Sequence, residues 1–195
     1  MYKVIRKAIS EELAEFCYDY FRLKRKVARL FFKIGYISAK DVNWGRCGDS
    51  QIPDTYSHYS DIAMETLLVK LQSLMEAETA FKLNPAYSYA RIYENGDVLA
   101  RHTDRPDCKF STTLNLGGDP WPIFLEPSGK KEKKGIRILL EAGDMLIYDG
   151  VTLEHWREKF EGEICCQVFL HYTTVEKKYN GRPFLGLPQC FRESL

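Results

Sequence analysis

The stretch AYSYARIYENGD, residues 86–97, marks the point at which the character of the sequence changes. Aromatic, branched and small residues alternate over residues 86–93, as they do in a half-buried β-strand. The segment ENGD then supplies the glycine and the acidic residues of a hairpin turn. We therefore expect the chain from here to about residue 174 to consist of short strands.

Six further strand-like segments follow, separated by clusters of Gly, Pro, Asp or Lys. They are KFSTTLNL (109–116), WPIFLEP (121–127), GIRILLEA (135–142), DMLIYDG (144–150), VTLEHW (151–156) and ICCQVFLHYTT (164–174). Their even spacing is typical of an all-β sandwich or barrel rather than of parallel βαβ units. The lysine-rich segment SGKKEKKG (128–135) is interpreted as a solvated hairpin tip.

The sequence before residue 81 has a helical pattern. Ser10, followed by Glu11 and Glu12, predicts a helix N-cap with acidic residues in the first turn. Apolar residues then recur at three- and four-residue spacing, namely Leu13, Phe16, Cys17, Tyr20, Leu23, Val27, Leu30 and Phe31. A second helix is predicted over residues 62–78. The segment between the helices, NWGRCGDSQIPDTYSHYSD (43–61), is predicted to be a loop that forms the rim of a binding site.

Composition narrows the classes of protein to consider. With 45% hydrophobic and 28% charged residues the chain is globular, and a net charge of +1 makes a nucleic-acid partner unlikely. The six cysteines, Cys17, Cys47, Cys108, Cys165, Cys166 and Cys190, lack zinc-finger spacing and are interpreted as reduced thiols. We find no signal peptide and no apolar run long enough to cross a membrane, so a cytoplasmic protein is expected. The sequence does not indicate an oligomeric state.

His102 and Asp104 stand two positions apart at the end of a predicted strand, where side chains at i and i+2 share a face. A third metal ligand is available in His155, which lies 53 residues after His102, with four predicted strands between them. In a barrel, four strands bring the chain back beside its starting point. Two imidazoles and one carboxylate form the facial triad of non-haem Fe(II) oxygenases, although zinc accepts the same ligands. His58 is interpreted as a loop residue and His171 as a structural one.

Three motifs carry a resemblance to a known family. They are RIYENGDVLARHTD (91–104), KFSTTLNLGGD (109–119) and EAGDMLIYDGVTLEHW (141–156). Together they resemble the Fe(II)/2-oxoglutarate-dependent dioxygenases, and within these the prolyl-hydroxylase-like branch. The similarity runs from about Tyr87 to Tyr172.

The resemblance implies a double-stranded β-helix, or jelly roll. The chain would then be a single domain, with a helical layer and rim loop over residues 1–80, a jelly-roll core over 81–175 and a C-terminal tail over 176–195. The fold class expected is therefore mostly β with N-terminal helices.

The resemblance also implies cofactors and roles. His102, Asp104 and His155 would bind Fe(II), Tyr93 would hydrogen-bond the distal carboxylate of 2-oxoglutarate, and Thr112 would line its pocket. Dioxygen would be consumed as 2-oxoglutarate is decarboxylated to succinate. The reaction expected is hydroxylation of an unactivated C–H bond in a peptidyl proline, an amino acid or another small substrate.

One departure from the family pattern concerns the cosubstrate. The family normally places a Lys or Arg about ten residues after the distal histidine, because a buried dianion needs a cationic partner. Here that position is Cys165. Arg157, assisted by the Gln167 amide, is the replacement we favour, and Lys109 and His171 are the alternatives.

Two other functions remain open on the sequence. The basic segment RLKRKVAR (22–29) suggests a repair dioxygenase for alkylated nucleobases, but a solvated helix face explains it better, and the paired arginines of that subfamily are missing. The second is a metal-binding jelly roll of the cupin kind that is non-catalytic or does not use 2-oxoglutarate.

Overall fold

The computed structural model describes residues 1–49, 51–106, 108–131 and 133–175. Within these residues, the strands form a seven-stranded major sheet and a four-stranded minor sheet. The major sheet has the order β1 (Tyr2–Ile5), β9 (Met145–Tyr148), β6 (Phe110–Gly118), β11 (Ile164–Thr174), β4 (Leu83–Glu94), β3 (Tyr56–Tyr59) and β2 (Arg46–Cys47). The minor sheet has the order β5 (Leu99–His102), β10 (His155–Arg157), β7 (Ile123–Leu125) and β8 (Ile136–Ile138). All the paired strands are antiparallel.

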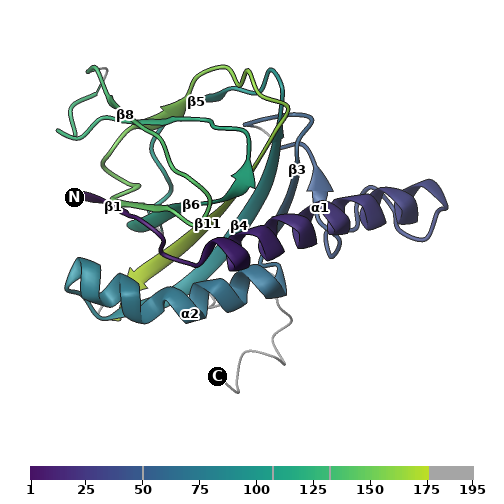
Figure 1. Cartoon of the computed structure of the whole chain (residues 1–195), viewed down its shortest axis with the longest axis horizontal. Helices are drawn as coiled ribbons and strands as arrows, with labels where there is room; N and C mark the ends of the chain where they lie inside the picture. The colour runs from purple at the N-terminus through teal and green to yellow at the C-terminus, as the bar shows by residue number, and fades with distance from the viewer. Residues whose placement is uncertain (50, 107, 132, 176–195) are drawn as a thin grey trace.

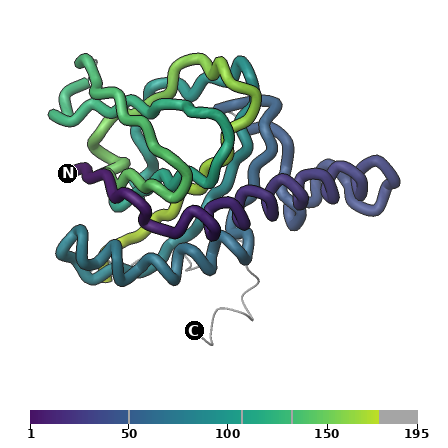
Figure 2. Tube along the Cα trace, in the orientation of Figure 1, coloured from purple at the N-terminus to yellow at the C-terminus, as the bar shows by residue number. Residues whose placement is uncertain are grey.

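The chain crosses repeatedly between the two sheets. From β4 onward it passes to β5 in the minor sheet, to β6 in the major sheet, to β7 and β8 in the minor sheet, and then through β9 and β10 to β11. This winding is that of a jelly roll, and Figure 2 shows the chain after residue 80 winding mostly above the two helices. The predicted jelly-roll core is confirmed.

Two helices cover the outer face of the major sheet (Figure 1). They are α1 (Glu11–Lys33) and α2 (Ile62–Thr79), and both lie close to the helices predicted from the sequence. Ser10 caps α1 as expected, because its hydroxyl accepts a hydrogen bond from the Leu13 N–H at 3.2 Å. Among the described residues, no helix is both long and apolar enough to cross a membrane.

The buried face of α1 differs from the predicted one. Ala14, Cys17, Phe21 and Ala28 are buried, whereas Phe16, Leu23 and Leu30 are exposed. The buried side chains are therefore one aromatic and three small ones, and of these the apolar repeat contained only Cys17. The basic segment that follows Phe21 is not a free cationic patch, because Lys24 and Arg25 form ion pairs with Asp61 and Glu94.

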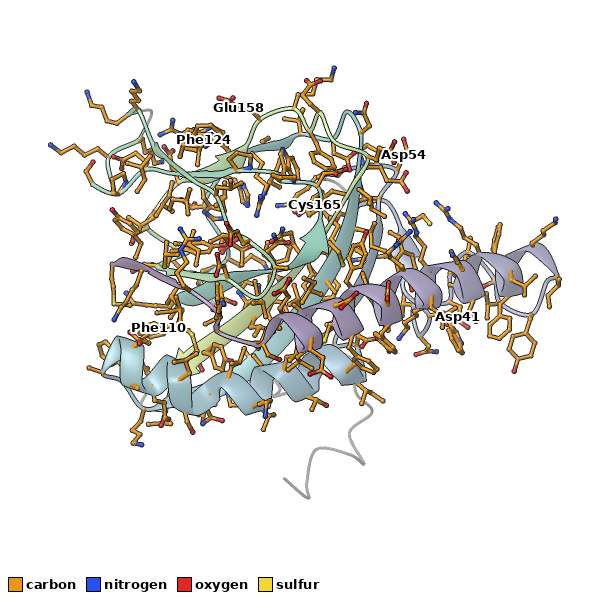
Figure 3. The ribbon with its side chains drawn as sticks, viewed as in Figure 1. Asp41, Asp54, Phe110, Phe124, Glu158 and Cys165 are labelled. Carbon is orange, nitrogen blue, oxygen red and sulfur yellow. The ribbon has the colours of Figure 1, made fainter. Side chains whose placement is uncertain are left out.

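Strand side chains divide cleanly between two environments, as a period of two requires. On β6 and β11, even-numbered residues pack against the helices, as Phe110, Leu114, Cys166, Val168, Leu170 and Tyr172 do. Odd-numbered residues point between the sheets and are largely polar. Figure 3 shows Phe110 beside α2 and Cys165 within the barrel, away from the helices. The inside of the jelly roll is therefore lined with groups able to do chemistry.

The segment 43–61 is more ordered than the predicted loop. It contains β2 and β3, which extend the major sheet beyond β4, and β1 at the other edge was not predicted either. In the described residues, Cys17, Cys47, Cys108, Cys165 and Cys166 are not in disulfides. Cys190 and the predicted tail (176–195) lie outside these residues.

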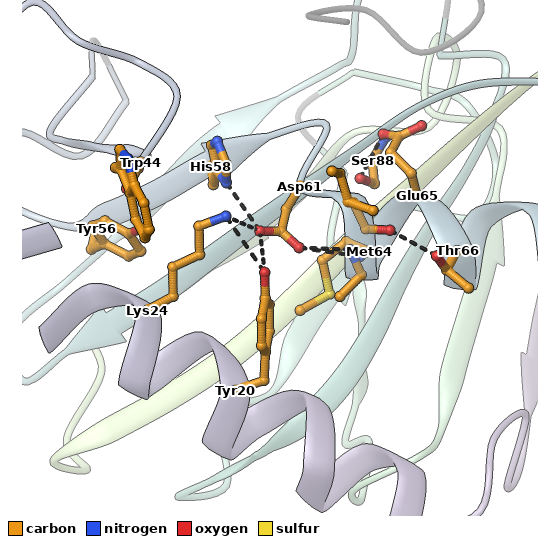
Figure 4. Close-up of polar contacts among 12 residues, drawn as sticks. Tyr20, Lys24, Trp44, Tyr56, His58, Asp61, Met64, Glu65, Thr66 and Ser88 are labelled. Carbon is orange, nitrogen blue, oxygen red and sulfur yellow. Dashed lines mark hydrogen bonds and ion pairs between the residues drawn. The ribbon is translucent and has the colours of Figure 1, made fainter. Parts of the chain in front are cut away.

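A buried carboxylate joins the helices to the sheet (Figure 4). The side chain of Asp61 is 0% exposed and caps α2 by accepting from the Ala63 N–H at 3.0 Å. It also accepts from the Tyr20 hydroxyl at 2.8 Å and from His58 Nδ1 at 3.2 Å, and it pairs with Lys24. These contacts fix α1, α2 and β3 relative to one another.

Candidate active site

Three candidate metal ligands come together at one end of the minor sheet. Strands β5 and β10 are neighbours, and His102 and His155 face each other in their register, with ring centroids 4.3 Å apart. The Oδ1 atom of Asp104 lies 3.8 Å from His102 Nε2 and 3.6 Å from His155 Nε2. Strands β6, β7, β8 and β9 lie between the two histidines in the chain, as the sequence predicted.

Both imidazoles are held so that Nε2 is free to bind a metal. His102 Nδ1 lies 2.7 Å from the Ala100 carbonyl oxygen, and His155 Nδ1 lies 3.0 Å from that of Leu153. Because a carbonyl oxygen only accepts hydrogen bonds, Nδ1 is the donor in each ring, which leaves Nε2 on the side of Asp104 as the atom available to a metal. Burial and the nearby His155 also lower the pKa of His102, which favours the neutral ring.

Asp104 is fixed from two sides. Its backbone N–H donates to the Gly150 carbonyl oxygen at 2.7 Å, and the Ser111 hydroxyl donates to its Oδ2 at 2.8 Å. Burial acts to raise the pKa of Asp104, but the His155 imidazole and the Ser111 hydroxyl outweigh it and bring the pKa to about 2. The side chain is therefore a carboxylate at neutral pH. Two imidazoles and one carboxylate fit a divalent metal such as Fe(II) or zinc.

A cavity of about 340 Å³ opens between the two sheets at this point. His102, Asp104 and His155 form part of its wall, together with Tyr93 and Tyr148. Arg46, Asp49 and Gln51, which belong to the segment 43–61, also line it. Arg105 and an aromatic group made up of Tyr59, Tyr87, Tyr89 and Phe169 complete the outer part of the cavity.

Arg157 is a fully buried cation behind this cavity. It lies two residues beyond His155 on β10 and is 1% exposed. Its guanidinium donates to the Trp121 carbonyl oxygen and, at 3.4 Å, to the Thr113 hydroxyl, while Nε has no partner. It forms no ion pair with any residue that the structure describes. Burial lowers the pKa of Arg157, and a buried charge of this kind is costly unless an anion joins it.

Tyr93 and Gln167 lie in the same polar cluster as Arg157. Tyr93 is fully buried, and burial raises its pKa while the charges of Arg91 and Arg157 oppose that rise. The Gln167 amide oxygen accepts from the Thr113 hydroxyl at 3.1 Å, and Thr113 in turn contacts Arg157. Tyr93 lines the cavity directly, whereas Arg157, Thr113 and Gln167 lie behind its lining.

Thr112 does not reach this cluster, which corrects its expected place in the pocket. Its neighbours Ser111 and Thr113 both point between the sheets, so Thr112 points to the opposite face of β6. Its hydroxyl accepts a hydrogen bond from the Leu170 N–H at 3.1 Å.

The two alternative cations do not place a positive charge in the cavity. Lys109 is exposed and its Nζ lies 3.3 Å from a carboxylate oxygen of Asp149. His171 does line the cavity, with its Nδ1 3.0 Å from the Ser111 hydroxyl oxygen. However, burial lowers the pKa of His171 to about 4, so its imidazole is neutral at pH 7.

Sequence reasoning missed several polar residues inside the barrel, above all Ser111 and Arg91. Arg91 is 1% exposed, pairs with Asp49 and donates to the Tyr89 hydroxyl at 2.5 Å. The alternation of Tyr87, Tyr89, Arg91 and Tyr93 along β4 contained the signal, because a charged residue in phase with aromatic ones points inward with them.

No family model matches this sequence, and no curated protein does either. Solved structures match well in shape. A Pseudomonas putida prolyl-4-hydroxylase is 14% identical with a TM-score of 0.63, covering 88% of this chain and 92% of that one. EctD from S. alaskensis is 14% identical with a TM-score of 0.63, covering 96% and 78%.

HygX from Streptomyces hygroscopicus, solved with nickel, 2-oxoglutarate and hygromycin B bound, is 12% identical with a TM-score of 0.60. The match covers 89% of this chain and 83% of that one. Another neighbour, from Burkholderia pseudomallei, is described as a member of the 2OG-Fe(II) oxygenase family. The chain thus has the fold of the 2-oxoglutarate- and Fe(II)-dependent oxygenases.

Proposed function

We propose that this protein is an Fe(II)- and 2-oxoglutarate-dependent oxygenase that hydroxylates an unactivated C–H bond. One observation carries the proposal: the His/Asp/His triad lies on β5, the loop after it and β10, and β10 also carries a buried arginine that has no acidic partner among the described residues. The triad suits a ferrous ion, and the arginine suits the far carboxylate of a dianionic cosubstrate. Neither feature is needed for a stable jelly roll.

His102, Asp104 and His155 hold the metal in this proposal. Bound there with 2-oxoglutarate, ferrous iron supplies dioxygen activation coupled to decarboxylation of the cosubstrate to succinate. The protein's part is to present two Nε2 lone pairs and one ionised carboxylate from one side, which leaves the other side open to the cavity. The Ala100 and Leu153 carbonyl groups keep both rings in the required tautomer.

Arg157 and Tyr93 hold the distal carboxylate of 2-oxoglutarate. The guanidinium gains the anionic partner that it lacks among the described residues, and Thr113 and Gln167 keep it in place through hydrogen bonds. Tyr93 and Tyr148 line the cavity and both lie near Arg157, so small adjustments of these side chains would bring the carboxylate and the guanidinium together. The side chains of Lys109 and His171 take no part in this pairing.

The outer part of the cavity suits a compact substrate that carries a ring. Tyr59 and Tyr89 lie with ring centroids 4.3 Å apart, and Tyr89 and Phe169 6.1 Å apart, so the rings form a continuous aromatic wall. Arg105 donates to the Tyr87 hydroxyl at 2.7 Å and adds a positive charge at the mouth. A peptidyl proline, an amino acid or another small molecule would fit this wall. The similar solved structures include a prolyl-4-hydroxylase and a complex with hygromycin B.

An anaerobic absorbance titration tests the proposal. Purified protein with Fe(II) should develop a weak visible charge-transfer band as 2-oxoglutarate is added. The band should be absent in His102→Ala and His155→Ala, and Arg157→Gln should require far more 2-oxoglutarate to produce it. Lys109→Gln is the matched control for loss of a positive charge and should titrate like the wild type. Succinate release with oxygen uptake would then establish turnover.

Iron binding without a band at any 2-oxoglutarate concentration would contradict the proposal. The chain would then be a metal-binding jelly roll of the cupin kind, or an oxygenase that uses another cosubstrate.

A further inference from the structure

A second group of possible metal ligands lies in the same cavity. One ligand atom each from Asp104, Cys108 and His171 lies within 4.8 Å of the other two. Cys108 is 2% exposed and His171 6% exposed, and all three residues line the cavity. The proposed oxygenase chemistry uses only Asp104 of this group, so the thiol and the second imidazole have no role in it.

Local structure explains why these three residues meet. A turn after Asp104, in which the Cys108 N–H donates to the Arg105 carbonyl oxygen at 2.9 Å, returns Cys108 toward the metal ligands. Strand β11 pairs with β6 so that His171 faces Ser111. The Ser111 hydroxyl oxygen then lies 2.8 Å from Asp104 Oδ2, 3.0 Å from His171 Nδ1 and 2.8 Å from the Cys108 carbonyl oxygen.

The donor types differ from those of the His/Asp/His triad. A thiolate is a soft ligand that favours zinc over iron. Two imidazoles and a carboxylate, in contrast, suit Fe(II) as well as they suit zinc. Three protein ligands with a fourth position open to the cavity is a common arrangement for zinc. The two sets share one carboxylate through different oxygens, because Asp104 Oδ1 faces the two histidines and Oδ2 faces Ser111.

We propose that Asp104, Cys108 and His171 form a separate site for a thiophilic divalent metal, with Zn²⁺ as the expected ion. On binding, the Cys108 thiol loses its proton to solvent as the sulfur–metal bond forms, and Asp104 turns its carboxylate away from the Ser111 hydroxyl. Because Asp104 serves both sets, Zn²⁺ in this site weakens iron binding at the triad, and iron weakens Zn²⁺ binding by the same factor.

Cobalt(II) provides the direct test, because a thiolate ligand gives it an intense near-ultraviolet charge-transfer band. Wild-type protein titrated with Co²⁺ should show this band, and Cys108→Ser should lose it. Cys47→Ser, which removes an exposed thiol, is the matched control and should keep the band. The double variant His102→Ala/His155→Ala should also keep it. A band that survives in Cys108→Ser, or no band in the wild type, overturns the proposal.

A measurement on the unmodified chain guards against variants that fold poorly. The ¹¹³Cd NMR spectrum of wild-type protein with Cd²⁺ should contain a resonance shifted downfield by sulfur ligation, and only oxygen and nitrogen ligation would contradict the site. Neither this experiment nor the cobalt titration depends on the oxygenase activity.

The competition between metals does rest on the proposed function. The Zn²⁺ concentration that halves succinate formation should rise at least tenfold in Cys108→Ser relative to Cys47→Ser. Equal values in the two variants would show that zinc acts at the triad alone. If no succinate forms in any variant while the cobalt band behaves as expected, then the oxygenase proposal fails and the thiol site stands.

Discussion

At the scale of single residues, we expect Arg157 to lower the stability of the ligand-free protein and to bind 2-oxoglutarate. Arg157 is buried and has no acidic partner in the part of the chain that the structure describes, so replacing it by an apolar residue of similar length should not weaken folding. We expect Arg157→Met to unfold at an equal or higher temperature than the wild type. The same variant should bind 2-oxoglutarate about 100-fold more weakly, since losing a buried charge pair costs about 3 kcal/mol.

Calorimetric titration of the Fe(II)- or Ni(II)-loaded protein with 2-oxoglutarate measures this affinity. Arg137→Met removes an exposed arginine from β8 and should leave the affinity unchanged. If Arg157→Met binds 2-oxoglutarate as the wild type does, another group neutralises the cosubstrate.

Gly150 has a steric role, because it leaves room for the side chains of Asp104 and Ser111. A Cβ atom at this position would meet Asp104 Oδ2 and lie 2.6 Å from the Ser111 hydroxyl oxygen. We expect Gly150→Ala to displace the Asp104 carboxylate from its position beside the two histidines and to weaken metal binding at least tenfold. Gly96→Ala is the contrasting variant, because Gly96 has a φ of +90° but no atom near its Cβ position.

Metal titrations and chemical unfolding separate the two glycine variants. Gly96→Ala should lose about 1 kcal/mol of stability from its left-handed backbone and keep its metal affinity. Metal affinity that falls in both variants alike would mean that general destabilisation, not displacement of Asp104, is responsible.

At the scale of elements, Asp61 is the point where α1, α2 and β3 are joined. Asp61→Asn keeps a capping side chain on α2 but leaves Lys24 buried without its counter-ion, since the Lys24 side chain is only 13% exposed. We expect a loss of about 3 kcal/mol in the free energy of unfolding at pH 7. The loss should appear in urea unfolding with little change in the m-value.

This contribution should depend on pH in a defined direction. Burial acts to raise the pKa of Asp61, but hydrogen bonds from His58 and Lys24 and the charge of Lys24 outweigh it and hold the folded-state pKa below the usual value of about 3.9. A depressed pKa stabilises the fold above the unfolded-state value and loses that effect as the pH falls below it. The gap in stability between wild type and Asp61→Asn should therefore narrow from pH 5 toward pH 2. A constant gap would contradict this account.

The elements also show what a sequence can predict and what it cannot. Strand β11 was predicted residue for residue, and the meeting of His102 with His155 followed from counting strands, because both depend on local alternation and on chain winding. Thr112 was expected to line the pocket, but its hydroxyl bonds to the Leu170 N–H instead, since a resemblance to a motif does not fix the phase of a strand. The apolar repeat of α1 also contained Phe16, Leu23 and Leu30, which are exposed, because apolar spacing alone does not decide which side of a helix faces the sheet.

At the scale of the whole molecule, the proposed ligands would connect its two sheets. The metal ligands and Arg157 belong to the minor sheet and the loop after β5, whereas Tyr93 belongs to β4 of the major sheet. A metal and a cosubstrate bound together would therefore hold both sheets in place, and their binding energy would add directly to the stability of the folded state.

Binding of the metal and of 2-oxoglutarate should therefore raise the unfolding temperature. With both ligands at about 100 times their dissociation constants, each should add about 2.7 kcal/mol to stability. For a chain of this size, each kcal/mol raises the unfolding temperature by about 2–4 °C, so adding 2-oxoglutarate to the metal-loaded protein should raise it by about 5–10 °C. Differential scanning calorimetry under nitrogen, with Ni(II) in place of Fe(II), measures the shift. Arg157→Gln should keep the rise in unfolding temperature caused by the metal but not the rise caused by 2-oxoglutarate. His155→Ala should lose both rises. A shift with 2-oxoglutarate that is equally large without metal would mean that the cosubstrate binds away from the triad.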